Sequence, residues 1–353
     1  MKHCILFLNG EYWGMYELME KFTPLFFKLH YGIPKNNLSI LKENEKEEGP
    51  QEECDNYLQL VEQYSLIDLS NEKNYKELEE YFDMDSLIEN YAIGIYLGTW
   101  DWPLQNQGMW KYFGDKIDGV KYTDGKWRFM TYDLDFSMGM TFENYGGVEG
   151  YQYDNFRHIE NRRGNTPPTN LFFSLLKNEI FKNKFINLYC DFSNYVMNIN
   201  KISLIINEYK ENVSWMFSNG KFRWWNDGKS SKLEGYAYNK NNFENVQLKN
   251  LQKFFEERGK YTVQHMKEHF NLKGELFELT ILIEGNGKVQ INTIIPEFEE
   301  GKWSGKYFSG IPINIIAITE DNKEFKGWTG DLDSDEKNIS LNLNKALTIK
   351  ANF

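Results

Sequence analysis

The most informative segment of the sequence is Trp100-Asp101-Trp102-Pro103-Leu104-Gln105-Asn106. Before it, apolar residues recur with helical spacing over 85–97, with Asp85 placed as the N-cap and Gly98 placed to end the helix. After it, 110–113 and 127–132 have the composition of two strands and are predicted to pair antiparallel. The quoted segment is therefore predicted to be a loop between a buried helix and a sheet, in a chain of the α+β class.

Two carboxylates follow the second predicted strand. Asp133 and Asp135 are two positions apart, so on an extended chain both side chains project from the same face. Like charges this close are unfavourable unless a cation or hydrogen-bond donors neutralise them. A bound divalent metal explains the pair, and so does exposure of both carboxylates to solvent.

Asp101 and Asn106 have a spacing with a known chemical use. Protein kinases use Asp-x-x-x-x-Asn, in which the aspartate contacts the acceptor hydroxyl and the asparagine binds metal, together with a second aspartate at a strand end. Asp133 supplies such a strand-end carboxylate. The alternative is purely structural: Asp101 caps a turn and Asn106 bonds the backbone.

The rest of the first 270 residues alternates helical patterns with turns. A hairpin is predicted at 5–18, where two apolar runs flank Asn9-Gly10. The charged stretch 42–55 is predicted to be a solvated surface loop, and 142–170 and 220–242 are also predicted to be loops. Further helices are predicted at 58–64, 78–82, 170–177, 181–195, 201–217 and 243–270.

The periodicity changes from helical to alternating near residue 274. Strands are predicted at 276–284, 288–295, 311–320 and 339–353, separated by Gly and Asp turns. We therefore predict two domains, 1–274 and 275–353, of which the second is a small all-β module. Trp328 is predicted to fill the core of this module rather than to form an exposed platform for a ligand.

Composition limits the classes of function. The 353 residues include 40 Lys and Arg against 52 Asp and Glu, a net charge of −12. This excess of acids disfavours nucleic acid or an anionic membrane as the main partner, but carboxylates bind Mg²⁺ or Mn²⁺, through which an acidic protein can hold a nucleotide. No apolar run is long enough to span a bilayer.

Other familiar site motifs give no support. The sequence contains neither a P-loop nor a Gly-x-Gly-x-x-Gly motif. His265 and His269 share a helix face but lack a third zinc ligand, so they are predicted to lie at a solvated helix end. A basic cluster is formed by Arg157, His158, Arg162 and Arg163. It either binds phosphate or an acidic loop of a substrate, or it is simply part of the solvent-exposed surface.

Three segments, in this order, resemble the spore coat protein H (CotH) kinase family. They are Phe7-Leu8-Asn9-Gly10-Glu11-Tyr12-Trp13-Gly14-Met15-Tyr16-Glu17-Leu18-Met19-Glu20-Lys21, the segment 101–106, and Lys126-Trp127-Arg128-Phe129-Met130-Thr131-Tyr132-Asp133-Leu134-Asp135. The likeness covers roughly 5–270, including Phe254-Phe255-Glu256-Glu257-Arg258. It implies an atypical protein-kinase-like fold that phosphorylates Ser or Thr of a protein substrate, with ATP and Mg²⁺ or Mn²⁺ as cofactors.

The resemblance also implies roles for single residues. Asp101 is implied to be the catalytic aspartate and Asn106 a metal ligand. Asp133 is implied to be the second metal-binding aspartate, with Asp135 beside it. In the hairpin-to-helix segment, Glu17 or Glu20 is implied to orient a lysine that binds nucleotide, for which Lys21 is a candidate outside any matching motif.

The chain departs from the family at its start. Family members carry sequence ahead of the hairpin, where further strands and the phosphate-contacting lysine are expected, so the kinase-like domain is expected to be N-terminally incomplete. The β module resembles small repeats of bacterial surface and secreted proteins. This resemblance implies a cell-surface or extracellular location and a polysaccharide or other surface partner, although the first ten residues lack a signal-peptide core.

Two other functions stay open. One is a non-catalytic surface or extracellular-complex binding protein on a kinase-like scaffold. The aromatic-rich segments 100–113 and 215–225, with Trp215, Trp224 and Trp225, favour it because aromatic rings suit carbohydrate stacking. The other is a glycoside hydrolase that uses Asp133 and a second carboxylate, for which the sequence contains no motif.

Overall fold

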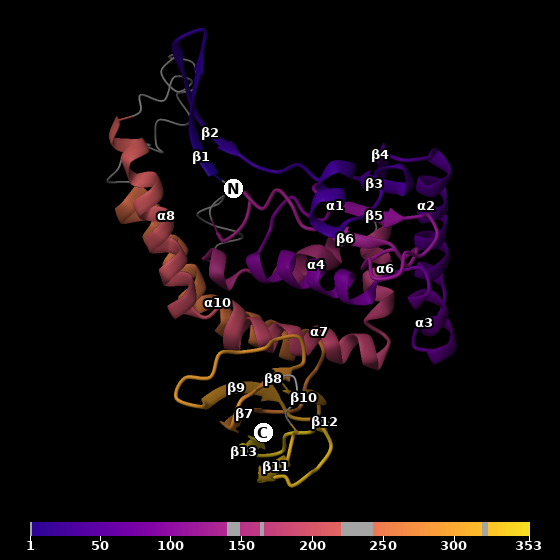
Figure 1. Ribbon diagram of the computed structural model, residues 1–353, viewed down its shortest axis with the longest axis vertical. Coiled ribbons are helices and arrows are strands. Elements are labelled where there is room, and N and C mark those ends of the chain that lie inside the picture. Colours follow the sequence, from indigo (N-terminus) through magenta and orange to yellow (C-terminus); the bar gives the residue numbers. More distant parts are fainter. Residues whose placement is uncertain (1, 140–148, 163–165, 220–242, 320–323) are drawn as a thin grey trace.

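The computed structural model describes residues 2–139, 149–162, 166–219, 243–319 and 324–353. The chain forms a hairpin, then a mixed body (residues 24–272), then a β module (residues 275–353) (Figure 1). In chain order, the elements before the β module are β1 (Lys2–Leu8), β2 (Glu11–Leu18), α1 (Pro24–Tyr31), η1 (Lys35–Asn37), β3 (Leu38–Lys42), β4 (Glu45–Glu48), α2 (Gln51–Leu66), α3 (Glu72–Glu79), α4 (Met84–Leu97), β5 (Gly108–Tyr112), β6 (Arg128–Met130), η2 (Gly150–Gln152), α5 (Asn155–Arg162), α6 (Pro167–Leu175), α7 (Glu179–Asp191), η4 (Phe192–Val196), α8 (Ile199–Asn219), η6 (Phe243–Gln247) and α10 (Leu248–His269).

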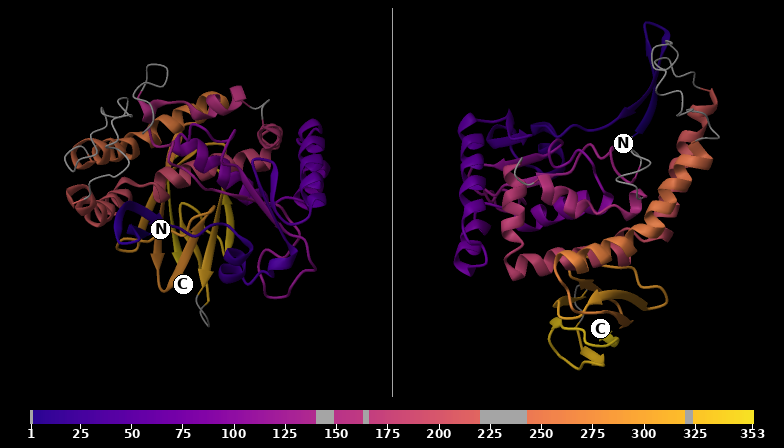
Figure 2. Two further views of the ribbon diagram at one scale, coloured as in Figure 1. Left: turned by 90° about the horizontal axis from the view of Figure 1, so that it is seen from above. Right: turned by 180° about the vertical axis from the view of Figure 1, so that it is seen from behind.

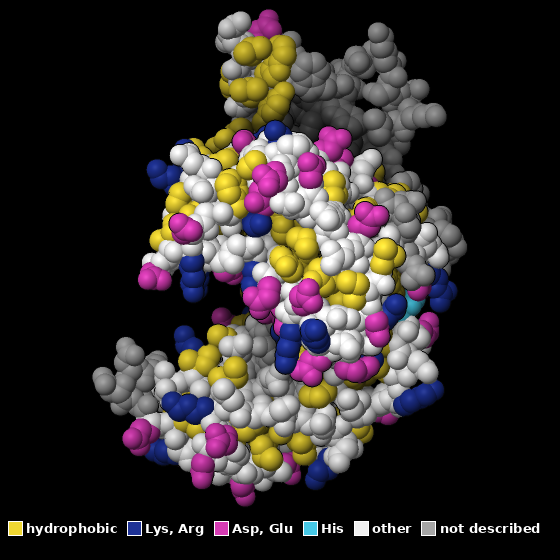
Figure 3. All heavy atoms as spheres, turned by 90° about the vertical axis from the view of Figure 1, so that its right-hand side faces the viewer, with side chains coloured by type: hydrophobic (Ala, Val, Ile, Leu, Met, Phe, Trp, Pro, Cys, Tyr) yellow, Lys and Arg dark blue, Asp and Glu magenta, His cyan; other side chains and the backbone are white. Residues whose placement is uncertain are grey.

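The predicted hairpin is confirmed as β1 and β2. They pair antiparallel across Asn9 and Gly10, whose φ angles of 53° and 85° suit a tight hairpin turn. Many of its apolar side chains are exposed, including Phe7 at 59% and Leu18 at 68%, and Figure 3 shows them as the yellow projection at the top. The hairpin reaches α8, where the rings of His3 and Tyr209 lie 5.5 Å apart.

The body contains an antiparallel sheet in the order β4-β3-β5-β6. β5 and β6 confirm the predicted strand pair. The prediction of a solvated loop over 42–55 is wrong, because Glu43 and Asn44 form a tight turn with φ angles of 51° and 66° that pairs β4 with β3. α2 then begins at Gln51. Every β4 side chain is exposed, so an edge strand of charged residues accounts for the composition.

α4 is the buried helix that leads into the segment 100–106. Its N-cap is Asp83 rather than the predicted Asp85, because the Asp83 carboxylate accepts a hydrogen bond of 3.1 Å from the backbone N–H of Ser86. The helix ends at the predicted position, where Gly98 has a φ of 68°.

Other helices of the body, α5 and α7, pack against α4. The prediction of a loop over 142–170 is wrong for most of the described residues, because α5 forms there and buries Phe156 and Ile159, and α6 begins at Pro167. The helices predicted at 170–177, 181–195, 201–217 and 243–270 are confirmed as α6, α7, α8 and α10. α8 and α10 pack side by side and extend from the body towards the hairpin (Figure 2). The loop predicted over 220–242 lies outside the described residues.

The described residues of the β module form two sheets, ordered β12-β10-β8 and β11-β13-β7-β9, and among these described strands only β13 and β7 pair in parallel. Its strands are β7 (Leu276–Glu284), β8 (Gly287–Ile291), β9 (Lys302–Phe308), β10 (Ile313–Thr319), β11 (Gly327–Gly330), β12 (Asn338–Leu341) and β13 (Leu347–Asn352). β9 and β11 were not predicted, because their glycines lower the strand propensity. The strand predicted over 339–353 is two strands, since polar residues interrupt it.

Trp328 lies in the core of the module, as predicted. Its side chain is 1% exposed, and its indole N–H donates a 2.9 Å hydrogen bond to the carbonyl of Glu336.

The β module packs against α7 and η4 (Figure 2), and the buried side chains of body and module form one continuous apolar cluster. α10 ends at His269 and β7 begins at Leu276, so the predicted boundary near 274 falls between these two elements. In the described part of the chain, no helix has both the length and the apolar character needed to cross a bilayer.

Candidate functional site

Asn106 connects the two acidic segments. Its side-chain N–H group donates to Oδ2 of Asp101 over 3.0 Å and to the backbone carbonyl of Asp133 over 3.4 Å. Asn106 and Asp133 both have left-handed backbones, with φ angles of 60° and 54°. Non-glycine residues in this region are strained, and such strain concentrates at functional sites. The tertiary structure thus brings three of the sequence-derived candidates into one place.

Backbone hydrogen bonds hold the two segments against each other. The N–H of Trp100 donates to the carbonyl of Phe136 over 2.8 Å, and the N–H of Met138 donates to the carbonyl of Leu97 over 2.7 Å. These two bonds join the end of α4 to the chain beyond β6 beside Asp101 and Asp133.

The ring of Trp102 attaches the loop that carries Asp101 to α4. Its side chain is buried, and its ring lies so close to α4 that a Cβ atom on Gly94 would be 2.6 Å from it. The ring also meets Tyr91 edge-on, with centroids 4.8 Å apart. Glycine at position 94 is required for this close approach.

α5 holds the first residues of the loop. The Nε2 atom of His158 lies 3.1 Å from the carbonyl oxygen of Trp100, and its Nδ1 atom lies 2.9 Å from the hydroxyl of Tyr153. Asn155 donates to the carbonyls of Gly94 and Thr99. His158 is buried, so it is a positioning residue and not part of an exposed basic cluster.

The other members of the predicted basic cluster do not reach this site. Arg157 is exposed and lies 3.8 Å from Asp154. The side chains of Arg162 and Arg163 lie outside the described part of the chain, as do those of Trp215, Trp224 and Trp225.

The prediction of a solvated helix end at His269 is wrong. Its side chain is only 10% exposed, and its Nε2 atom lies 2.9 Å from Oδ2 of Asp154. This contact joins the end of α10 to the segment before α5, which the local sequence pattern did not show.

Arg258 fixes the C-terminal end of α4. Its buried guanidinium donates to the carbonyls of Ile95 and Tyr96 over 2.8 and 2.6 Å, and to those of Tyr151 and Tyr153 over 3.1 and 2.7 Å. Burial lowers the pKa of Arg258 to about 10, which leaves it charged at neutral pH. A cation is favourable at this end of a helix because the carbonyl groups there carry partial negative charge.

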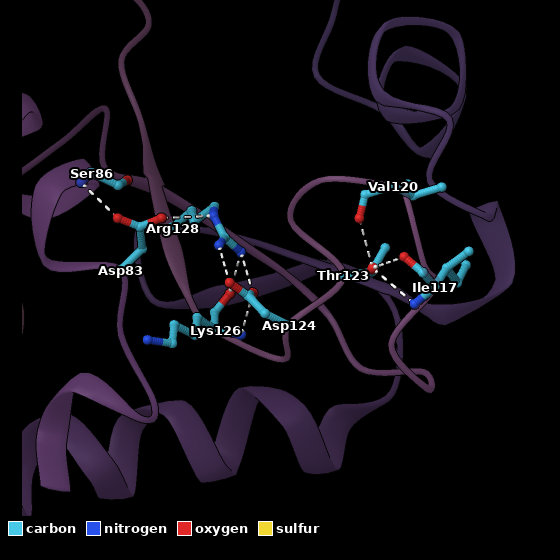
Figure 4. Close-up of polar contacts among 8 residues, drawn as sticks. All are labelled: Asp83, Ser86, Ile117, Val120, Thr123, Asp124, Lys126 and Arg128. Atoms are coloured by element: carbon cyan, nitrogen blue, oxygen red, sulfur yellow. Dashed lines mark hydrogen bonds and ion pairs between the residues drawn. The ribbon is translucent and has the colours of Figure 1, made fainter.

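Arg128 anchors the strand that leads to Asp133 (Figure 4). Its guanidinium makes two hydrogen bonds to Asp124, of 2.8 and 2.6 Å, and its Nε atom lies 3.0 Å from Oδ2 of Asp83. Because Asp83 is also the N-cap of α4, one buried arginine connects the start of that helix to the start of β6. In the adjoining loop, the hydroxyl of Thr123 accepts a hydrogen bond from the backbone N–H of Ile117 and donates towards the carbonyls of Ile117 and Val120 (Figure 4).

The carboxylates of the site lie close enough to affect one another. Partial burial, followed by the carboxyl of Asp135 and the charge of Asp101, raises the pKa of Asp133. The Oδ1 atom of Asp101 is buried and has no hydrogen-bond partner among the described residues. Buried polar atoms normally have a partner, so a further donor or a cation would stabilise this arrangement.

The donor set suits a hard cation. Carboxylate and amide oxygens are the ligands that Mg²⁺ and Mn²⁺ prefer, and Asp101, Asn106, Asp133 and Asp135 supply them. Across the described ranges, however, no three His, Cys, Asp or Glu side chains are already arranged as a complete metal site. The residues therefore fit a divalent cation by their chemistry, without a preformed cage.

The hairpin residues implied to bind nucleotide lie elsewhere. Glu17 lies 3.5 Å from His3 on the paired strand, and Glu20 lies 2.9 Å from His30. Lys21 forms an ion pair of 2.9 Å with Glu47 of β4. None of these three residues contacts the Asp101 site in the described structure.

Glu43 is a neighbour of the site that the sequence did not indicate. Its Oε1 atom accepts a 3.3 Å hydrogen bond from the backbone N–H of Asn106, and its own N–H donates to the carbonyl of Gln107 over 2.8 Å. Next to it, the Nζ atom of Lys42 lies 5.7 Å from the ring centre of Tyr132. No motif marks Glu43 or Lys42, because their positions depend on strand pairing.

The body combines α-helices with a β-sheet, so the protein is of the α+β class. Its acidic site, which is compatible with a cation, follows a buried helix. The chain belongs to the CotH kinase protein family, whose model matches residues 1–262 and so includes every residue of the site. This membership confirms the resemblance found in the sequence and suggests a kinase-like function. No curated protein matches the sequence.

Proposed function

We propose that the protein transfers the γ-phosphate of ATP to Ser or Thr of a protein substrate, in a reaction that requires Mg²⁺ or Mn²⁺. Family membership over residues 1–262 supports kinase-like chemistry. The observation that carries the proposal is the position of Asn106, whose amide contacts Asp101 and the backbone of Asp133 at once. This contact unites the Asp-x-x-x-x-Asn spacing with the strand-end carboxylate.

In the proposed reaction, the acceptor hydroxyl oxygen forms a bond to the γ-phosphorus as the bond to the bridging oxygen breaks and ADP leaves. Asp101 orients the hydroxyl and receives its proton. Asn106 orients Asp101 by donating a hydrogen bond to its Oδ2 atom. Glu43 positions the loop by accepting the backbone N–H of Asn106.

Asn106, Asp133 and Asp135 are the residues that would hold the cation. When bound, a divalent metal neutralises the phosphate charge. Partial burial and, after it, the neighbouring carboxyl groups of Asp135 and Asp101 raise the pKa of Asp133, and a bound cation would offset both effects.

The test compares the protein with Asp133→Ala. We expect calorimetric titration to show ATP binding that requires Mg²⁺ or Mn²⁺, and radiolabelled ATP to show phosphate transfer to casein or myelin basic protein. Both are expected to be lost in Asp133→Ala, with unchanged thermal unfolding. Asp118→Ala, which removes an exposed carboxylate from the β5–β6 loop, is the matched control.

Retained transfer in Asp133→Ala would contradict the assignment. A protein that binds no ATP with either metal would favour the alternative, a non-catalytic surface binding protein on the same scaffold. A cell-surface or extracellular location is part of the proposal, supported by the resemblance of the β module to surface-protein repeats. Fractionation of the source cells with an antibody against the β module tests that location.

A further inference from the structure

A polar cleft lies where the body meets the β module. Figure 3 shows the molecule hollowed between the module at the bottom and the body above it. The cleft has a volume of about 320 Å³, and its walls include Glu89 of α4, Asn187 of α7, Gln290 of β8 and Asn314 of β10. Its body walls come from the first part of α4 and from α7, whereas the Asp101 site follows the last turn of α4.

Asn187 lines this cleft and carries a polar atom that has no hydrogen-bond partner among the described residues. The residue is 5% exposed, and its side-chain N–H group donates to the carbonyl of Pro312 over 2.7 Å. Its Oδ1 atom is buried and has no hydrogen-bond partner among the described residues. A buried carbonyl of this kind is stabilised when a ligand supplies a donor.

The cleft carries further unused polar groups. Asp85 pairs with Lys184 across the cleft at 2.9 Å, but Glu89, one turn later on α4, makes no ion pair or hydrogen bond to any described residue. The side-chain amide of Asn314 is likewise unpartnered within the described ranges. Burial against the cleft walls, followed by the negative charges of Asp85 and Asp83, raises the pKa of Glu89. This direction agrees with the absence of a hydrogen-bond donor to its carboxylate among the described residues.

We propose that this cleft binds a neutral sugar unit of a glycan. Sugar hydroxyl groups both donate and accept, so they match a free carboxylate and several amides better than a ligand with a single charge. The ammonium of Lys184 in the wall disfavours a metal cation, and the two acids disfavour an anion.

A peptide fits this cleft less well. Peptide recognition usually relies on exposed aromatic or apolar anchor pockets. The apolar residues that line the cleft, Ile88 and Leu188, are both buried. The proposal does not depend on phosphate transfer and needs neither ATP nor metal.

The experiment uses the full chain without ATP or divalent metal. Saturation-transfer NMR and calorimetry measure binding of maltotetraose, cellotetraose and chitotetraose. We expect at least one of them to bind, and Glu89→Ala and Asn314→Ala each to weaken that binding at least fivefold. The matched controls are Glu62→Ala on exposed α2 surface and Asn338→Ala on β12, which are expected to bind as the parent does.

Thermal unfolding of each variant shows that the fold is kept. The proposal is overturned if none of the three oligosaccharides binds, or if Glu89→Ala and Asn314→Ala bind as tightly as the parent. It is also overturned if a pool of unstructured peptides binds in their place and is weakened by the same two substitutions, because the cleft would then recognise protein.

Discussion

Tyr307 of β9 donates a 2.7 Å hydrogen bond from its hydroxyl to Asp191, the last residue of α7, and both side chains are fully buried. The same carboxylate accepts two hydrogen bonds from Thr293 and one from Asn292. Four donors of the β module thus satisfy one carboxylate of the body. This polar contact makes the attachment of the module specific, because any other docking would leave Asp191 buried without partners.

Tyr307→Phe is expected to lower the free energy of unfolding by about 1–3 kcal/mol, since it removes one donor from a buried carboxylate. Urea denaturation at pH 7 measures the change. Tyr81→Phe is the matched control, because Tyr81 is 41% exposed and its hydroxyl bonds to no described residue. Equal stability of the two variants would show that the hydroxyl of Tyr307 does not stabilise the junction.

Asp191 is expected to make stability depend on pH. Burial raises the pKa of Asp191 to about 6, although the hydrogen bonds from Tyr307 and its neighbours lower it. Between pH 4 and 6 the folded state then binds more protons at this site than the unfolded state, so stability falls as pH rises through this window. The contribution amounts to at most about 3 kcal/mol.

Asp191→Asn isolates this effect, because the amide does not titrate. We expect the stability of the parent relative to the variant to be higher at pH 4.5 than at pH 7, by about 2 kcal/mol. Urea denaturation of both proteins at several pH values provides the comparison. A difference that stays constant with pH would place the pKa of Asp191 near its ordinary value.

Gly94→Ala is expected to destabilise the protein, although alanine normally stabilises a helix by up to about 1 kcal/mol relative to glycine. The new Cβ would lie 2.6 Å from the ring of Trp102, which must then move together with Asp101. Gly259→Ala in α10 is the control, because the nearest atom to its Cβ would be the side-chain oxygen of Ser193 at 3.3 Å, and the other neighbours would lie at 3.5 Å or more.

Thermal unfolding of the two glycine variants measures the difference. If Gly94→Ala unfolds at the same or a higher temperature than Gly259→Ala, the ring of Trp102 has room to shift and does not fix the loop.

Arg258→Lys is expected to loosen the loop that carries Asp101. A lysine cannot reach four carbonyls at once, so carbonyls at the end of α4 lose their partner, at a cost of about 2 kcal/mol or more. Hydrogen exchange should speed up for the backbone N–H groups of residues 98–101. Arg157→Lys, at an exposed position, is expected to leave exchange unchanged. Faster exchange spread evenly over the whole body would indicate general destabilisation instead.

Local patterns predicted several elements because local interactions form them. The Asn9-Gly10 turn, the buried stripe of α4 and the Gly98 cap depend on residues a few positions apart. The stretch 42–55 was predicted wrongly for the opposite reason. Its charges suggest a loop, but pairing with β3, whose other edge joins β5, makes part of it a strand.

The sequence by itself determined the candidate carboxylates, their spacing and the family. Only the tertiary structure decided that Asn106 contacts both Asp101 and Asp133, that Glu43 supports them, and that Arg258 holds the end of a helix some 160 positions earlier. Periodicity and turn motifs report backbone conformation and burial over a few residues. Which distant polar groups meet is decided when the chain packs, because a buried donor or acceptor must then find a partner from another part of the fold.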